Sequence, residues 1–72
     1  MNNIDKKKNE KQPIEKGQII TENCMSIGKR GDGIFKHKGF VVIVPDTESG
    51  KTYTIKITKV MDKVSFGKIQ DE

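Results

Sequence analysis

The segment from Lys51 to Met61 alternates between apolar and polar residues, and this alternation is the strongest constraint on the fold. Tyr53, Ile55 and Ile57 fall on one face, and threonines and a lysine fall on the other. Successive side chains of a β-strand point to opposite faces, so a period of two predicts a strand with one buried face. The alternation slips at Lys59-Val60, which predicts a β-bulge or a corner.

Four further strands are expected, each bounded by glycine, proline or short polar turns. They cover Gln18 to Ile27, Gly31 to Lys38, Phe40 to Val44 and Val64 to Gln70. In the first of them Ile20, Cys24 and Ile27 are the expected inward residues, although Glu22 falls on the same face as Ile20 and Cys24. Short strands that follow one another every 8 to 12 residues or so are typical of a small barrel. A barrel also leaves no strand edge unpaired.

The apolar composition favours the same all-β class. The chain contains no Ala, Leu or Trp, and its apolar residues are mostly Ile and Val. Ala and Leu are the strongest helix formers, whereas β-branched residues fit a pleated sheet. We therefore expect a small five-stranded antiparallel barrel over residues 17–70. Residues 1–16 show neither the period of 2 that is typical of strands nor the period of 3.6 that is typical of helices. They predict a flexible basic tail, either an inert solubilising segment or a loose electrostatic arm.

Several classes of protein are excluded by what the sequence lacks. One cysteine and one histidine cannot build a disulfide framework or a four-ligand metal site, and they favour a reducing compartment. No apolar run is long enough to span a membrane, and the lysines near the N-terminus precede no signal-peptide core. No nucleophile is placed with His37 in an evident catalytic constellation, and so small a barrel lacks an ordinary substrate pocket. We expect a protein without enzymatic activity, metal or cofactor.

The stretch from Ile27 to Pro45 concentrates the features that favour nucleic-acid binding. It contains two turn signals, Gly31-Asp32-Gly33 and Lys38-Gly39, whose glycines are expected to provide positive φ. The tripeptide Arg30-Gly31-Asp32 resembles a cell-adhesion motif, but it is short and the single cysteine argues against an extracellular location. A phosphate-binding P-loop would need Lys-Ser/Thr and a helix after the last glycine, and neither is present. Cationic residues lie among two phenylalanines: Lys29, Arg30, Lys36, His37 and Lys38, with Phe35 and Phe40.

Two interpretations of this stretch differ in where the aromatic rings point. If Ile34 points into the core, alternation turns Phe35 and His37 outward, where Phe35 and Phe40 could stack on unpaired bases. The alternative is that both rings fill the core of a protein short of bulk. Phe66 is left open between core and surface, and Tyr53 is assigned to the core. Stacking rings with surrounding Lys and Arg predict binding of single strands with little sequence preference.

The order and spacing of these motifs resemble the TRAM domain. The resemblance covers about residues 17 to 70 and rests on Gly31-Asp32-Gly33-Ile34, Gly39 with Val42-Ile43-Val44-Pro45, and Gly50 with Ile55-Lys56-Ile57-Thr58-Lys59-Val60. It is closest in kind to small archaeal proteins that consist of this domain alone. It implies a five-stranded OB-like barrel, RNA binding and, for stand-alone members, an RNA-chaperone role similar to that of cold-shock domains.

The chain departs from the TRAM pattern in two ways. Phe35 stands where a small residue such as Ala is usual, and Glu22 and Cys24 stand where apolar residues are usual. The implied RNA-binding positions are Lys29, Arg30, Phe35, Lys36, His37, Lys38 and Phe40, to which Phe66 and Lys68 of the last strand are added.

The hypothesis that follows is a cytoplasmic, monomeric, non-enzymatic RNA-binding protein and RNA chaperone. It would bind single-stranded regions of RNA, tRNA and rRNA included, with low sequence specificity and with no membrane partner. A protein-interaction module, or a tRNA-delivery module that works with a separate RNA-modifying enzyme, is the alternative.

Overall fold

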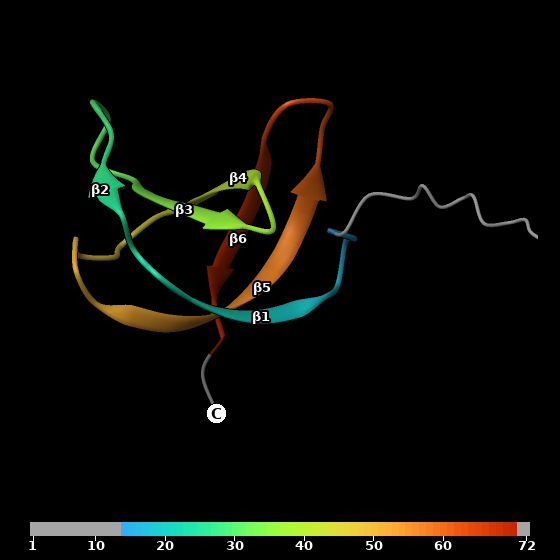
Figure 1. The fold of residues 1–72 in the computed structure, drawn as a ribbon, viewed down its shortest axis with the longest axis horizontal. Coiled ribbons are helices and arrows are strands. Elements are labelled where there is room, and N and C mark those ends of the chain that lie inside the picture. Colours follow the sequence, from blue (N-terminus) through green and yellow to red (C-terminus); the bar gives the residue numbers. More distant parts are fainter. Residues whose placement is uncertain (1–13, 71–72) are drawn as a thin grey trace, which may run out of the picture.

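All five expected strands form, and the first of them is broken in two. The computed structural model describes residues 14–70; the greater part of the expected tail, residues 1–13, lies outside the described residues. The strands are β1 (Ile19–Asn23), β2 (Ser26–Ile27), β3 (Gly33–His37), β4 (Phe40–Val44), β5 (Thr52–Val60) and β6 (Ser65–Ile69), as Figure 1 shows. The described part of the chain contains no helix, so none could cross a membrane.

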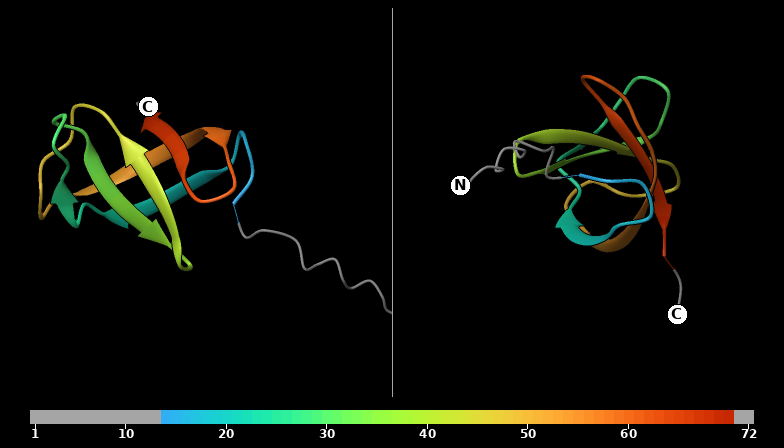
Figure 2. Two further views of the ribbon diagram at one scale, coloured as in Figure 1. Left: turned by 90° about the horizontal axis from the view of Figure 1, so that it is seen from above. Right: turned by 90° about the vertical axis from the view of Figure 1, so that its right-hand side faces the viewer.

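One curled sheet contains all six strands, in the order β1-β5-β6-β4-β3-β2. The segment that carries β1 and β2 bends at Cys24-Met25, so that β1 pairs with β5 while β2 pairs with β3. A single stretch of chain therefore connects both edges of the sheet and curls it into a partly open barrel (Figure 2). This confirms the OB-like architecture. The ladder differs from an all-antiparallel one because β4 and β6 run parallel.

Phe35 is the largest fully buried side chain, and it identifies the inner face of β3. Its ring meets that of Tyr53 edge-on, with centroids 6.1 Å apart. The prediction that Ile34 points inward and Phe35 outward is therefore wrong. In a chain without Leu or Trp, one aromatic ring supplies the volume that fills the barrel.

The core is built from residues along most of the described chain. Its buried members are Ile14, Ile20, Cys24, Phe35, Val42, Val44, Ile55 and Ile57, with Phe40, Tyr53, Val60 and Ile69 packed against them. Ile14 is buried although it precedes Gly17, where the folded part was expected to begin. Ile27, expected to face inward, is 41% exposed because the chain bends before it. A bulge does occur in β5, but its register shift lies between Ile57 and Lys59, just before the predicted position at Lys59-Val60.

The two glycines of the Gly31-Asp32-Gly33 turn have different roles. Gly31 has a φ of +92°, as expected, whereas Gly33 is not among the residues with positive φ. A Cβ on Gly33 would lie 1.8 Å from Oγ1 of Thr47 and 3.0 Å from Sγ of Cys24. Gly33 is therefore required for the close approach of β3 to the loop after β4, and the expectation of positive φ there is wrong.

Candidate nucleic-acid interface

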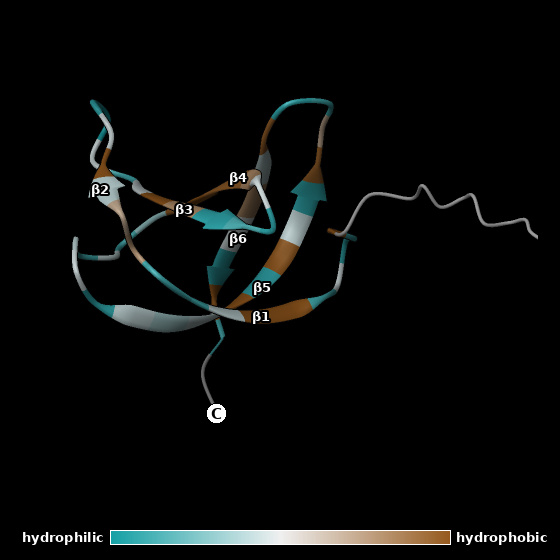
Figure 3. Cartoon of the chain, viewed as in Figure 1, coloured by the Kyte–Doolittle hydropathy of each residue, from teal (hydrophilic) through white to brown (hydrophobic). Residues whose placement is uncertain are grey.

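Three half-buried apolar side chains form a row across the outer face of the barrel. Ile34 of β3 pairs with Ile43 of β4, and Ile43 pairs with Phe66 of β6. The neighbours of these residues in the strands alternate with them and are buried inside the barrel. Ile34, Ile43 and Phe66 are called the outer row below. The row exists because every residue of β4 is apolar, so that both of its faces are apolar. Figure 3 colours β4 as a hydrophobic strand.

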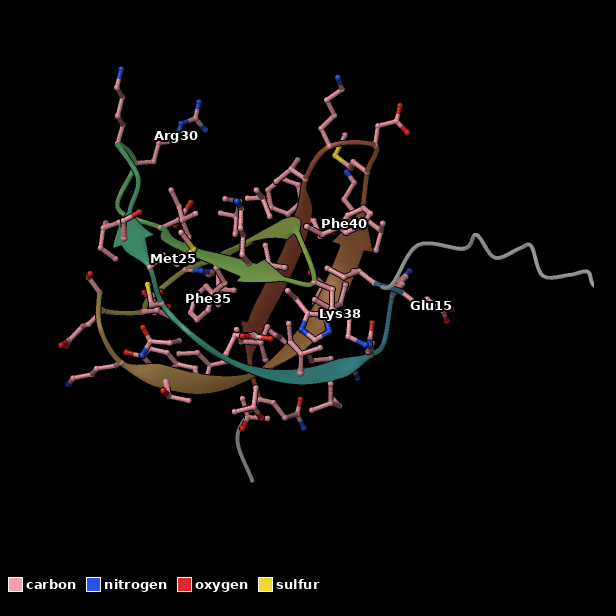
Figure 4. All side chains as sticks on the ribbon, in the orientation of Figure 1. Glu15, Met25, Arg30, Phe35, Lys38 and Phe40 are labelled. Atoms are coloured by element: carbon pink, nitrogen blue, oxygen red, sulfur yellow. The ribbon has the colours of Figure 1, made fainter. Side chains whose placement is uncertain are left out.

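The loop between β2 and β3 covers one end of the outer row. Backbone hydrogen bonds from Gly28 N to Asp32 O (2.8 Å) and from Gly31 N to Gly28 O (3.0 Å) hold this loop closed. Between the loop and the sheet lies a hollow of about 170 Å³, lined by Gly28, Lys29, Arg30, Asp32, Ile34 and Ile43. Arg30 extends away from the barrel (Figure 4). The hollow thus has an apolar floor, and its rim carries two cations, Lys29 and Arg30, and one carboxylate, Asp32.

Exposed lysines lie beside the outer row on three strands. Lys36 is two residues from Ile34 on the same face of β3, and Lys68 is two residues from Phe66 on β6. Lys59 of β5 pairs directly with Phe66. Among residues 14–70 the ion pairs are His37–Glu22 and Lys51–Glu48, so none of these lysines is neutralised there.

A second loop projects to the same side as the β2–β3 loop. This is the β5–β6 loop, which is closed by a hydrogen bond from Met61 N to Val64 O (2.9 Å) and carries the exposed Lys63. Both loops rise on one side of the sheet in Figure 1 and Figure 2. In OB-folds the equivalent loops, after the first and fourth strands, flank the face that binds oligonucleotides.

The structure divides the expected binding residues into two groups. Exposed or on the outer face are Lys29, Arg30, Lys36, Lys38, Phe66 and Lys68. Phe35 is fully buried and cannot stack on a base in this fold. Phe40 and His37 pair with each other on the inner side of the ladder, where Phe40 packs against the core.

The side chain of His37 contacts an acidic side chain of β1. Its Nδ1 lies 2.6 Å from Oε2 of Glu22, and the two side chains are 14% and 31% exposed. The expectation that His37 points outward is wrong because it shares the inner side of β3 with Phe35. Its pairing with Glu22 also explains how an acidic residue can lie on the inward side of β1.

Sequence reasoning named Phe66 but missed Ile34 and Ile43 as its neighbours on the outer face, together with Lys59 and Lys63. The signal was present in Phe40-Val41-Val42-Ile43-Val44, which is apolar at every position. A half-buried strand alternates, so an uninterrupted apolar run predicts that the second face is covered or binds something. Within residues 14–70, no cluster of three His, Cys, Asp or Glu side chains could hold a metal ion.

Comparison with known proteins places the chain among nucleic-acid-binding domains. The family model described as the TRAM domain matches residues 16–69. An uncharacterized protein of Methanocaldococcus jannaschii is 43% identical over 54 residues, which are 75% of this chain and 70% of that protein. A conserved protein of Methanococcus maripaludis, known from its solution structure, superimposes with a TM-score of 0.79 at 37% identity. That match covers 83% of this chain and 86% of the other.

Longer proteins contain a similar segment as a small part. A ribosomal RNA large subunit methyltransferase E of Methanothrix thermoacetophila is 37% identical over 79% of this chain, but only 22% of that protein is covered.

Proposed function

This chain belongs to the TRAM domain family, and we propose that it is a non-enzymatic RNA-binding protein that acts as an RNA chaperone. The TRAM domain is a nucleic-acid-binding domain found in RNA-modifying enzymes and translation factors. The proposed ligand is single-stranded RNA, including unpaired regions of tRNA and rRNA, bound with low sequence specificity. The proposed form is a cytoplasmic monomer.

The observation that carries this proposal is the outer row with its rim of cations. Phe66 offers an aromatic ring on the outer face, between Ile43 on one side and Lys59 on the other. Stacking of a base on such a ring contributes about 1–3 kcal/mol whatever the base is. Lys and Arg around the row supply contacts to the phosphates, which add affinity without sequence preference. Phe66 thereby takes the role first expected of Phe35 and Phe40.

Chaperone activity follows from binding one state of the RNA better than another. An outer face that accepts unstacked bases binds open strands and cannot reach bases inside a duplex. Binding then shifts RNA from misfolded hairpins toward open states by the difference in affinity between the two. The names of the longer relatives, a ribosomal RNA methyltransferase and translation initiation factor 2 subunit beta, support RNA as the partner class.

Titration of an unstructured RNA of about 12 nucleotides, a length within the range of OB-fold site sizes, tests the proposal. About four phosphate contacts predict a slope of roughly −3 in a plot of log affinity against log salt. Phe66→Leu keeps an apolar side chain but removes the ring, so we expect affinity to fall about 5- to 100-fold. Lys51→Gln is the matched control, because Lys51 lies before β5 and is paired with Glu48. Affinity that is independent of salt, or equal for Phe66→Leu and the wild type, contradicts the proposal.

One observation favours a second candidate, a module that docks on another protein. Met25, which is labelled in Figure 4, and Ile27 lie two residues apart on the bent segment and are 55% and 41% exposed. Exposed apolar side chains that cluster mark protein-interaction sites. Failure of the wild type to bind any RNA at micromolar concentration, together with capture of an RNA-modifying enzyme that Met25→Ser abolishes, would favour this function.

A further inference from the structure

Two lysines face each other directly across the β5–β6 ladder. Lys56 and Lys68 are opposite partners in the antiparallel register, and both are exposed. Like charges directly opposite in a sheet destabilise it, and natural strands usually place an acidic or polar residue there. This pair therefore costs stability in the isolated protein, and a bound anion would offset that cost.

A third lysine is fixed beside this pair by backbone hydrogen bonds. Gly17 N donates to Ile57 O (2.7 Å), and Ile57 N donates to Gln18 O (2.9 Å). These bonds extend the β1–β5 ladder and hold Lys16 next to β5. The three lysines surround a groove of about 480 Å³, whose lining residues are Lys16, Gly17, Lys56, Ile57, Thr58 and Lys68. No carboxylate is among the residues that line it.

The bulge in β5 lies in the wall of the same groove. The register passes from Ile57–Gly67 to Lys59–Phe66 and leaves Thr58 without a partner. The Thr58 hydroxyl donates to the carbonyl oxygen of Phe66 (3.2 Å), which joins the groove to the outer row. Phe66 and Lys68 are also neighbours on one face of β6. A strand of nucleic acid whose base stacks on Phe66 would have its next phosphates above Lys68.

We propose that this lysine groove is a second phosphate-binding site, which takes the phosphodiester backbone of single-stranded RNA as it leaves the outer row. The inference rests on the proposed function and extends its footprint along β5 and β6, from Lys59 and Phe66 to Lys56 and Lys68. The strands β3, β4, β6 and β5 are successive neighbours in the sheet, so a ligand that spans them crosses three strand spacings, or about 14 Å. RNA that occupies both parts must be longer than RNA that reaches only the outer row.

The test compares a short RNA of about 4 nucleotides with a long one of about 12, both within the OB-fold range of roughly 4–16 nucleotides. In the double variant Lys16→Gln, Lys56→Gln, which leaves Lys68 beside the outer row in place, we expect the salt slope for the long RNA to become shallower by about 1.4, for two lost contacts. Its affinity for the long RNA should fall about 10-fold at low salt, while the short RNA binds as before. The urea midpoint of the double variant should equal or exceed that of the wild type, because the repulsion is gone.

Single variants provide the control for net charge. Lys56→Gln and Lys51→Gln each remove one positive charge near the same strand, but only Lys56 lines the groove. The groove proposal is overturned if the two single variants bind the long RNA with equal affinity and salt slope. It is also overturned if the double variant binds the long RNA as the wild type does. In either case RNA binding by the outer row still stands. If the wild type binds neither RNA, the proposed function fails, and RNA as the ligand of the groove fails with it.

Discussion

Oε2 of Glu22 lies 2.6 Å from Nδ1 of His37, and this contact connects two strands that share no ladder. Glu22 belongs to β1 and pairs with Tyr53 of β5, whereas His37 belongs to β3 and pairs with Phe40 of β4. The barrel is open between β1 and β3 apart from the β2 segment. The Glu22–His37 hydrogen bond therefore closes part of the wall that backbone pairing leaves open.

Loss of either partner should destabilise the barrel and leave RNA affinity unchanged. A hydrogen bond to a charged group contributes about 1.5–3 kcal/mol, and His37→Ala leaves the Glu22 carboxylate half-buried without that partner. We expect the free energy of unfolding in urea to fall by about that amount. Glu22→Gln should cost less, because the amide oxygen can still accept from the imidazole. An intact urea midpoint for His37→Ala would show that the contact does not stabilise the fold.

The three phenylalanines should separate cleanly into core and surface. Phe35→Ala removes the largest buried ring and its edge-on contact with Tyr53; such a change costs about 3–5 kcal/mol, enough to unfold a domain this small. Phe40→Ala, from a half-buried position against the core, should cost less but still lower the thermal midpoint. Phe66→Leu should leave the thermal midpoint nearly unchanged and weaken RNA binding. Circular dichroism melting combined with RNA titration checks all three, and a folded Phe35→Ala variant with weakened RNA binding would reverse the assignment.

The strand positions could be predicted from sequence because turns and alternation are local signals. The Lys38-Gly39 turn has φ values of 52° and 89°, as a two-residue hairpin requires, and it fixes the register of His37 with Phe40. What sequence could not supply was which face of β3 is inside. Ile34 and Phe35 are both apolar, so alternation holds equally well with either one buried.

Tertiary packing decides that choice through residues far away in the chain. Gly33 must approach Thr47, which turns the next inward position to Phe35, and Tyr53 supplies the ring against which Phe35 packs. The consequence for the site is direct: once Phe35 faces inward, Ile34 and Ile43 face outward and Phe66 becomes the accessible ring. The cations were easier to predict, because exposed Lys and Arg in loops need no knowledge of the core.

The pKa of Lys51 is raised above its ordinary value of 10.5, first by its hydrogen bond to Glu48 and then by the charge of that carboxylate. Nζ of Lys51 lies 3.1 Å from Oε1 of Glu48, and both side chains are largely exposed. A raised pKa means that the pair stabilises the folded state below the unfolded pKa, and that this stabilisation is lost as the pH rises through the folded pKa. Near neutral pH, Lys51→Gln should therefore have little effect on stability, since exposed pairs contribute little. Titration of the Lys51 side chain by NMR should show its pKa fall toward the ordinary value in Glu48→Gln.

Gly33→Ala should be far more damaging than Gly31→Ala, although Gly31 has the unusual backbone. At Gly31 a Cβ meets nothing within 4 Å, so the cost is only that of a positive φ, about 1 kcal/mol. At Gly33 a Cβ collides with the buried Thr47, whose hydroxyl donates to Val44 O (3.2 Å) and cannot swing away without losing that bond. Thr47→Ser in the Gly33→Ala background should rescue little, because serine loses only the γ-methyl and keeps the hydroxyl oxygen that lies 1.8 Å from the new methyl group. Urea unfolding of the two glycine variants measures the difference, and equal midpoints would show that the loop after β4 can move away from β3 at no cost.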